Sequence, residues 1–189
     1  MSGRNIGIAI EIPQPYAQIL QDWRQRLGDP TSGRIPPHVT LLPPTLLTEA
    51  ALTEVEEHLR LIAQDEHGFE MHLRGTGTFR PVSPVTFVQV AAGISDCERL
   101  ESRVRSGPLD RPVRFNYHPH VTVAHDVADD LLELGFQQLA GFDARFPVWG
   151  FSLFEQGPDR TWRPRLDFPF GRELPGPPEA HPTPRPEEW

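Results

Sequence analysis

Two histidine–threonine pairs carry the clearest chemical signal in this sequence: His38 with Thr40, and His120 with Thr122. In both places the tetrapeptide is Pro-His-Val-Thr. Because successive side chains of a β-strand point to opposite faces, each histidine shares a face with its threonine, and the valine faces the other way. Two such strands facing each other would line a pocket with two imidazoles, which transfer protons near neutral pH, and two hydroxyls, which donate hydrogen bonds.

The repetition of this tetrapeptide is hard to attribute to chance. With 8 histidines and 11 threonines in 189 residues, about half of one His-x-Thr pattern is expected. On these two motifs the chain resembles the 2H phosphoesterase superfamily, which is named for two His-x-Thr/Ser-x motifs. Within it the chain is most similar to the bacterial 2′-5′ RNA ligase or RNA 2′,3′-cyclic phosphodiesterase branch, over roughly residues 5–170.

The resemblance implies a metal-independent phosphodiesterase that opens the 2′,3′-cyclic phosphate of RNA ends or nucleotides to a 2′-phosphate. It also implies 2′-5′ ligation in the reverse direction, although bulk water favours hydrolysis. By the same resemblance, His38 would be the acid on the leaving oxygen and His120 the base that activates water; the sequence alone leaves the two roles interchangeable. The hydroxyls of Thr40 and Thr122 would bind the non-bridging phosphate oxygens, where charge builds in the transition state.

Several other residues are candidates for substrate binding because of where they lie in the sequence. His118 and Tyr117 precede the second motif, and His125 stands where the RNA-processing branch commonly has an arginine, three residues after the second threonine. His125 either contacts phosphate when protonated or simply ends the strand. Tyr117 and Trp149 are the aromatic residues best placed to stack a base, although such residues are more often part of a core. Other phosphate ligands are sought among the arginines, namely Arg34, Arg74, Arg80, Arg114, Arg163 and Arg165.

Composition narrows the classes of function. A net charge of −8 argues against a broad basic face for long nucleic acid, so we expect an RNA 3′ end or a small cyclic nucleotide as substrate. The chain contains no lysine, which excludes a ligase that carries a nucleotide on a catalytic lysine. The pair His118-x-His120 could suggest a metal site, but no cysteine or acidic cluster lies at ligand spacing. We therefore expect neither a metal nor another cofactor.

The first residues and the single cysteine indicate the cellular compartment that we expect for the protein. The first residues show neither a long apolar run nor a cleavage-site pattern, and Cys97 has no partner for an internal disulfide. We therefore expect a cytoplasmic monomer that does not contact membranes.

From Gly171 the chain is dense in proline and nearly free of apolar residues, which predicts a mobile tail over 171–189.

The order of predicted elements repeats along the chain. Apolar periodicity and turn residues predict strands at 5–12, 37–42, 69–79, 84–91, 117–123, 142–154 and 161–168, and helices at 13–27, 48–64, 94–105 and 127–140. Pro43 and Pro44 are expected to stop the first motif strand. Each half thus reads strand, helix, motif strand, helix, strand, which indicates a tandem duplication.

This pattern predicts an α+β fold with two pseudo-symmetric lobes, each an antiparallel sheet with helices on the outside, around a central cleft. Residues 1–170 would form this single bilobal domain, with halves at about 1–80 and 84–170 and allowance for strand exchange between them. The alternative to an enzyme is a non-catalytic module that binds a nucleotide or cyclic phosphate on the same fold. A pure binding module, however, has no need of two proton-transfer groups.

Overall fold

The structure, a computed structural model, describes residues 3–112 and 115–171. Its elements in chain order are β1 (Arg4–Glu11), α1 (Tyr16–Arg26), β2 (His38–Leu47), α2 (Glu49–Asp65), β3 (Phe69–Thr78), β4 (Val85–Ala92), α3 (Ile94–Val104), the 3₁₀ turn η1 (Gly107–Leu109), β5 (His120–His125), α4 (Asp129–Gln138), β6 (Asp143–Val148), β7 (Gly150–Gln156) and β8 (Trp162–Pro169). Apart from Gly171, the tail predicted for 171–189 lies outside the described residues, as does Arg114.

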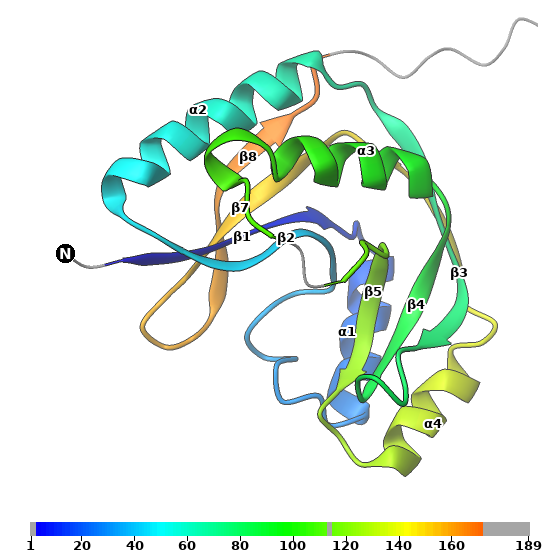
Figure 1. Ribbon diagram of the computed structural model, residues 1–189. Coiled ribbons are helices and arrows are strands. Elements are labelled where there is room, and N and C mark those ends of the chain that lie inside the picture. The colour runs from blue at the N-terminus through cyan, green and yellow to red at the C-terminus, as the bar shows by residue number, and fades with distance from the viewer. Residues whose placement is uncertain (1–2, 113–114, 172–189) are drawn as a thin grey trace, which may run out of the picture.

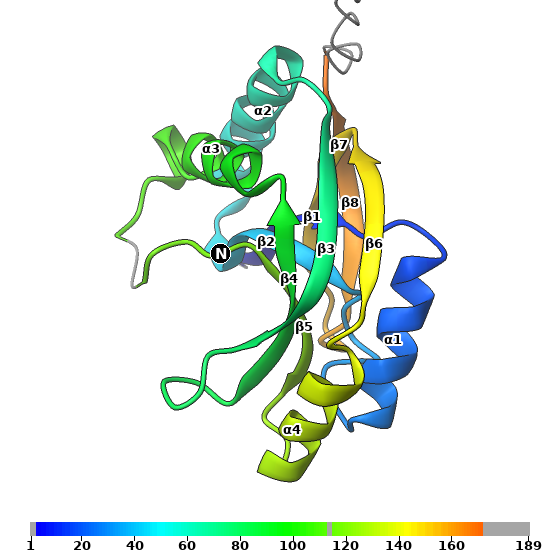
Figure 2. The ribbon, with the colours of Figure 1, turned by 90° about the vertical axis from the view of Figure 1, so that its right-hand side faces the viewer.

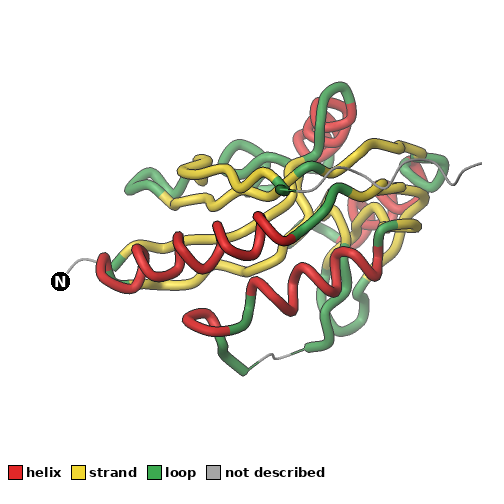
Figure 3. Tube along the Cα trace, turned by 90° about the horizontal axis from the view of Figure 1, so that it is seen from above, coloured by secondary structure: helices red, strands yellow, loops and turns green. Residues whose placement is uncertain are grey.

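Two antiparallel four-stranded sheets form the two lobes, which confirms the predicted α+β class. The first sheet has the strand order β2-β1-β7-β8, and the second has the order β5-β4-β3-β6. Helices α2 and α3 lie together over the first sheet, whereas α1 and α4 contact strands of the second (Figures 1 and 2). Seen from above, α2 and α3 run side by side along one flank of the strands (Figure 3). None of the described helices is long and apolar enough to cross a lipid bilayer.

The two lobes exchange strands. Strand β3 comes from the first half of the chain but pairs with β4 and β6 of the second half, while β7 and β8 return to the first sheet through the pairing of β7 with β1. Each sheet therefore contains chain from both halves of the sequence. This exchange ties the lobes together through backbone hydrogen bonds and fixes the spacing of the cleft between them.

Strand β2 does not stop at the two prolines as the sequence predicted. It runs through Pro43 and Pro44 to Leu47, with a register shift against β1 between the pairs Ile6–Thr45 and Ile8–Leu42. Because β2 is the edge strand of the first sheet, one side of its backbone has no partner strand among the described residues, and a residue without an N–H is tolerated there.

Two further boundaries differ from the sequence prediction. The segment 142–154 is not one strand but two, β6 in the second sheet and β7 in the first, separated at Trp149. A side chain on Gly150 would lie 2.5 Å from the carbonyl oxygen of Phe168, so a residue without Cβ is needed where the chain changes sheets. The second motif strand begins at His120 rather than at 117, which leaves His118 in the preceding loop.

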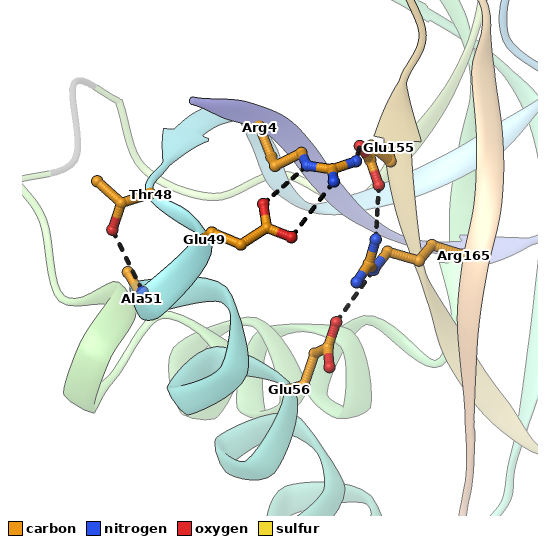
Figure 4. A network of polar contacts seen from close by, with 7 residues as sticks. All are labelled: Arg4, Thr48, Glu49, Ala51, Glu56, Glu155 and Arg165. Carbon is orange, nitrogen blue, oxygen red and sulfur yellow. Dashed lines mark hydrogen bonds and ion pairs between the residues drawn. The ribbon is translucent and has the colours of Figure 1, made fainter. Parts of the chain in front are cut away.

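Helix α2 is fastened to the first sheet at its N-terminal end. Arg4 donates hydrogen bonds to Glu49 of the helix and Glu155 of β7, while Arg165 of β8 donates to Glu155 and to Glu56 of the helix, both at about 3 Å (Figure 4). Thr48, the residue before the helix, caps it, because its hydroxyl accepts the N–H of Ala51 (Figure 4). Exposed ion pairs of this kind each stabilise a fold only slightly, but they form a network that holds the helix in register.

Candidate active site

Both motif strands show the alternation that the sequence predicted. Val39 and Val121 are fully buried, while the histidine and threonine on either side of each valine are half-buried. The valines, with their apolar neighbours in β2 and β5, belong to one continuous core that runs through both lobes. Because the core holds the valines on one side of each strand, the imidazole and hydroxyl groups must face the other side.

All four motif side chains line a single cleft between the lobes. The cleft has a volume of about 1100 Å³, and His38, Thr40, His120 and Thr122 are among its lining residues. Strands β2 and β5 contact each other across the boundary between the two sheets. Folding therefore brings together two imidazoles that are 82 residues apart in the chain.

Each imidazole is oriented in the same way. Nδ1 of His38 lies 2.8 Å from the carbonyl oxygen of Pro36, and Nδ1 of His120 lies 2.7 Å from that of His118. A carbonyl oxygen can only accept, so each Nδ1 carries a proton and donates it. In the neutral ring the lone pair is then on Nε2, which is left to accept or deliver a proton in the cleft.

The environment favours the neutral form of both rings. Burial lowers the pKa of His38 to about 4, with smaller contributions in the same direction from the positive charge of Arg24 and from a charge on His120. Burial also lowers the pKa of His120, and a charge on His118 lowers it further. The hydrogen bonds to the two backbone carbonyls oppose these shifts.

Aromatic rings form the wall beside His120. The ring centroids of Phe79 and Phe87 each lie 5.0 Å from that of His120, and the His118 ring stacks on His120 at 6.2 Å. Phe87 occupies this place because Gly77 opposite has no side chain: a Cβ there would lie 2.4 Å from the Phe87 ring. This wall supplies the burial that lowers the pKa of His120 and restricts the orientation of its ring.

A buried ion pair anchors the loop that leads into the first motif. Arg24 of α1 donates to Asp29 at 3.0 Å, to the hydroxyl of Thr31 at 3.0 Å and to the carbonyl of Ile35 at 2.6 Å. Both charged side chains are almost fully buried. The next carbonyl along the chain, that of Pro36, orients His38, so Arg24 acts on His38 both through the loop and through its charge.

Comparison with known proteins identifies the family of the chain. A model of the 2′-5′ RNA ligase superfamily matches residues 12–160. The chain belongs to the 2′-5′ RNA ligase superfamily. The resemblance drawn from the two motifs is thereby confirmed at the level of the family.

Relatives of the chain cover nearly all of it. A protein of Oceanobacillus iheyensis named as a candidate phosphoesterase is 30% identical over 169 residues, which are 88% of this chain and 98% of that protein. A Bacillus pumilus protein named in the same way is 29% identical over the same shares of the two chains. Among solved structures, Escherichia coli LigT superposes with a TM-score of 0.67 at 16% identity, over 90% of this chain and all of LigT. TT0787 of Thermus thermophilus superposes with a TM-score of 0.63 at 22% identity, over 89% of this chain and 98% of TT0787. These two likenesses show a shared fold.

Within this superfamily fold, Tyr117 joins the two lobes. Its hydroxyl donates a 3.0 Å hydrogen bond to the carbonyl of Thr40 in the first motif strand. Burial raises the pKa of Tyr117, so the hydroxyl stays protonated and remains a donor. The sequence suggested Tyr117 as a base-stacking residue; the structure gives its hydroxyl a positioning contact on β2.

Replacing Tyr117 with phenylalanine separates these two roles, because it keeps the ring and removes only the hydroxyl. We expect the variant to lose about 1 kcal/mol of unfolding free energy, the usual value of one hydrogen bond, because the carbonyl of Thr40 loses its donor. Urea denaturation followed by circular dichroism measures this loss. An unchanged midpoint would show that the contact does not hold the lobes together.

The remaining predicted residues divide into those in the cleft and those outside it. His118 and His125 line the cleft, and His125 forms a 3.4 Å pair with Asp126. Trp149 does not: it is half exposed at the corner between β6 and β7, and it is not part of the described cleft wall. The chain changes sheets at Trp149, and the described cleft wall gives no support to its suggested role in base stacking.

Of the arginines considered from the sequence, only Arg34 is part of the described cleft wall. The others that the structure describes form ion pairs with acidic residues elsewhere: Arg74 with Asp143, Arg80 with Glu133, Arg163 with Asp159, and Arg165 with Glu56 and Glu155. Among the cleft residues that sequence reasoning missed are Arg24, Arg105, Arg160 and Trp162. No local pattern distinguishes them, because the pairing of distant segments brings them to the cleft. In the described part of the chain, no group of three or more histidine, cysteine, aspartate or glutamate side chains is arranged to hold a metal ion.

Proposed function

We propose that this protein is a metal-independent phosphodiesterase that opens a 2′,3′-cyclic phosphate to a 2′-phosphate by acid–base catalysis from His38 and His120. One observation carries the proposal. Both imidazoles donate Nδ1–H to the carbonyl two residues upstream and line the same cleft, so both Nε2 atoms are left for proton transfer.

The reaction needs one proton acceptor and one proton donor. One imidazole takes a proton from water through Nε2 while the water oxygen attacks phosphorus. The bond from phosphorus to the ribose 3′ oxygen breaks, and the second imidazole gives its Nε2 proton to that oxygen. The hydroxyls of Thr40 and Thr122 donate to the non-bridging oxygens as negative charge grows on them. The product is a 2′-phosphate monoester with a free 3′-hydroxyl.

Family membership and relatives support a phosphoesterase. The curated relatives carry that name, and the LigT crystal structures contain 3′-AMP, ATP or NADP⁺, all of which bear phosphate. We extend this preference for phosphorylated nucleotides to the present chain. An RNA 3′ end and a small cyclic nucleotide are both phosphorylated nucleotides of this kind.

The assignment of acid and base differs between two arguments. The family resemblance makes His38 the acid. Burial and, to a smaller extent, the cation of Arg24 favour the neutral form of His38, which is the form that a base needs. The environment of His38 in the free protein therefore supports the reverse assignment, with His120 as the acid. A substrate whose leaving group needs no protonation separates the two assignments.

The pH profile follows from the lowered pKa values. Catalysis needs one neutral and one protonated imidazole, and in the free protein that form is most abundant between the pKa of about 4 and the ordinary value of 6.5. We expect kcat/KM to peak in this interval and to fall as pH rises towards 8, because the proton of the acid is lost. The bound phosphate anion raises both pKa values, so kcat should peak at a higher pH. Initial rates across this range measure both profiles, and a kcat/KM maximum above pH 7.5 would contradict the account.

The direct test uses 2′,3′-cyclic AMP and a cyclic-phosphate-ended oligonucleotide, each with EDTA present. We expect turnover of at least one of them to a 2′-phosphate, identified by ³¹P NMR. Loss of activity on adding EDTA would show that a metal ion takes part. Binding without turnover would instead identify a nucleotide-binding module.

A further inference from the structure

The cleft wall is basic, although the chain as a whole is acidic. The protein carries a net charge of −8, yet the described residues that line the cleft include four arginines and a single acidic residue, Glu101. Such a local excess of positive charge draws anions into the cleft. The four arginines are Arg24, Arg34, Arg105 and Arg160.

These arginines differ in what they are bound to. Arg24 is paired with buried Asp29, and Arg105 lies 3.5 Å from Glu101. Arg34 and Arg160 are exposed, and neither has a side-chain ion pair or hydrogen bond with another residue in the described part of the chain. Their guanidinium groups are thus the two in the cleft wall that remain open to an anionic ligand.

Arg34 and Arg160 lie on two segments that touch. Arg34 is in the loop before β2, and Arg160 is in the turn between β7 and β8; the N–H of Trp162 donates to the carbonyl of Arg34 at 2.7 Å. The loop and the turn lie side by side in both ribbon views (Figures 1 and 2). Arg34 is four residues before His38, so its Cα lies within about 14 Å of that of His38.

An aromatic ring lies at the same end of the cleft. Trp162 lines the cleft, and a Cβ on Gly7 would meet its ring at 3.4 Å, so the ring lies over the small residue of β1. The cleft volume of about 1100 Å³ is at the upper end for sites that take one small molecule, usually roughly 300–1,000 Å³. There is room beyond the two motifs for a further part of the substrate.

We propose that Arg34 and Arg160 form a second anion subsite, which binds another phosphate of a substrate whose cyclic phosphate lies between the two motif histidines. Trp162 stacks on the base or sugar that joins the two phosphates. The proposal rests on the proposed function and adds that the preferred substrate carries at least two phosphates one ribose unit apart. A dinucleotide with a cyclic-phosphate end and ADP-ribose cyclic phosphate share this chemistry.

The test compares three substrates: 2′,3′-cyclic AMP, a diadenosine dinucleotide ending in a 2′,3′-cyclic phosphate, and ADP-ribose 1″,2″-cyclic phosphate. We expect kcat/KM to be at least tenfold higher for one of the two larger substrates, and which of them gains identifies the natural class. The double variant R34A/R160A should lose roughly 10- to 100-fold on that substrate, because two charge-assisted contacts are removed. It should change less than twofold on cyclic AMP.

Arg74→Ala is the control, because it removes one positive charge from an exposed arginine of the second sheet that is not part of the described cleft wall. Equal kcat/KM for all three substrates in the wild type, or an equal loss on all three in the double variant, would overturn the subsite. If no substrate is turned over, the proposed function fails by itself. Calorimetric binding of 2′-AMP and of the dinucleotide 2′-phosphate then tests the subsite. The double variant should bind 2′-AMP as the wild type does, and an equal affinity of the two proteins for the dinucleotide 2′-phosphate would overturn the subsite.

Discussion

Replacing either His38 or His120 with alanine is expected to lower kcat on a 2′,3′-cyclic phosphate by roughly 10²–10⁴-fold, the usual contribution of one general acid or base. Each replacement removes an Nε2 that faces the cleft and leaves the buried valine beside it unchanged. The fold should therefore survive. The loss of kcat in the double variant should be smaller than the product of the two single losses, since either histidine alone cannot complete the reaction.

The same variants separate the acid from the base. A substrate with a 4-nitrophenolate leaving group needs no protonation of the departing oxygen, so the variant that lacks the acid should regain most of its activity on it. The variant that lacks the base should not. Recovery in His120→Ala would identify His120 as the acid, as the environment of His38 suggests; recovery in His38→Ala would support the family assignment.

His67→Ala is the control for the histidine replacements, because His67 lies between α2 and β3 and is not among the described cleft residues. It should keep full activity. Wild-type turnover in either motif variant, with the fold checked by circular dichroism, would refute the two-histidine mechanism.

Replacing Thr40 or Thr122 with valine is expected to lower kcat by roughly 10²–10³-fold, as the loss of one oxyanion donor does elsewhere. Valine matches threonine in shape, and both threonines are half-buried in the cleft, so the change removes a hydroxyl and little else. The effect should appear in kcat more than in KM, because the hydroxyls bind the charge that develops in the transition state.

Serine at the same two positions provides the matched comparison. Thr40→Ser and Thr122→Ser keep the hydroxyl and should retain activity within about tenfold of the wild type, well above the valine variants. If serine and valine reduce kcat equally, the hydroxyls do not contact the reacting phosphate. The threonines would then serve only to shape the strands.

The parts of the site that the sequence predicted are those set by local periodicity. In Pro-His-Val-Thr the alternation of a strand places histidine and threonine on one face, and fully buried Val39 and Val121 confirm it. The repeat of the motif, with the repeated order of strands and helices, predicted the two lobes and the family. Both features can be read from the sequence without knowing which distant segments pair.

The parts that the sequence did not predict depend on pairing between distant segments. Nothing near Trp149 indicates that the chain changes sheets there, yet that change removes it from the cleft, whereas Trp162 lines it. The sequence predicted a strand end at Pro43 and Pro44 because a strand tolerates proline only at the edge of a sheet. Whether a strand lies at the edge depends on the strand order of the whole sheet, which a local pattern does not show. Arg24 lies within α1, and only the fold shows that its side chain donates a hydrogen bond to the carbonyl of Ile35, the residue before Pro36.

The central claim is that both motif imidazoles face one bound phosphate, and NMR of the histidine rings tests it most directly. The ring resonances of His38, His120 and His58 are followed as pH is changed, without ligand and with 2′-AMP; His58 contacts Val104 and is not in the described cleft wall. We expect the pKa values of His38 and His120 to lie below 6.5 in the free protein and to rise together on binding, while His58 does not respond. A response of only one cleft histidine, or of neither when 2′-AMP is bound, would contradict the account.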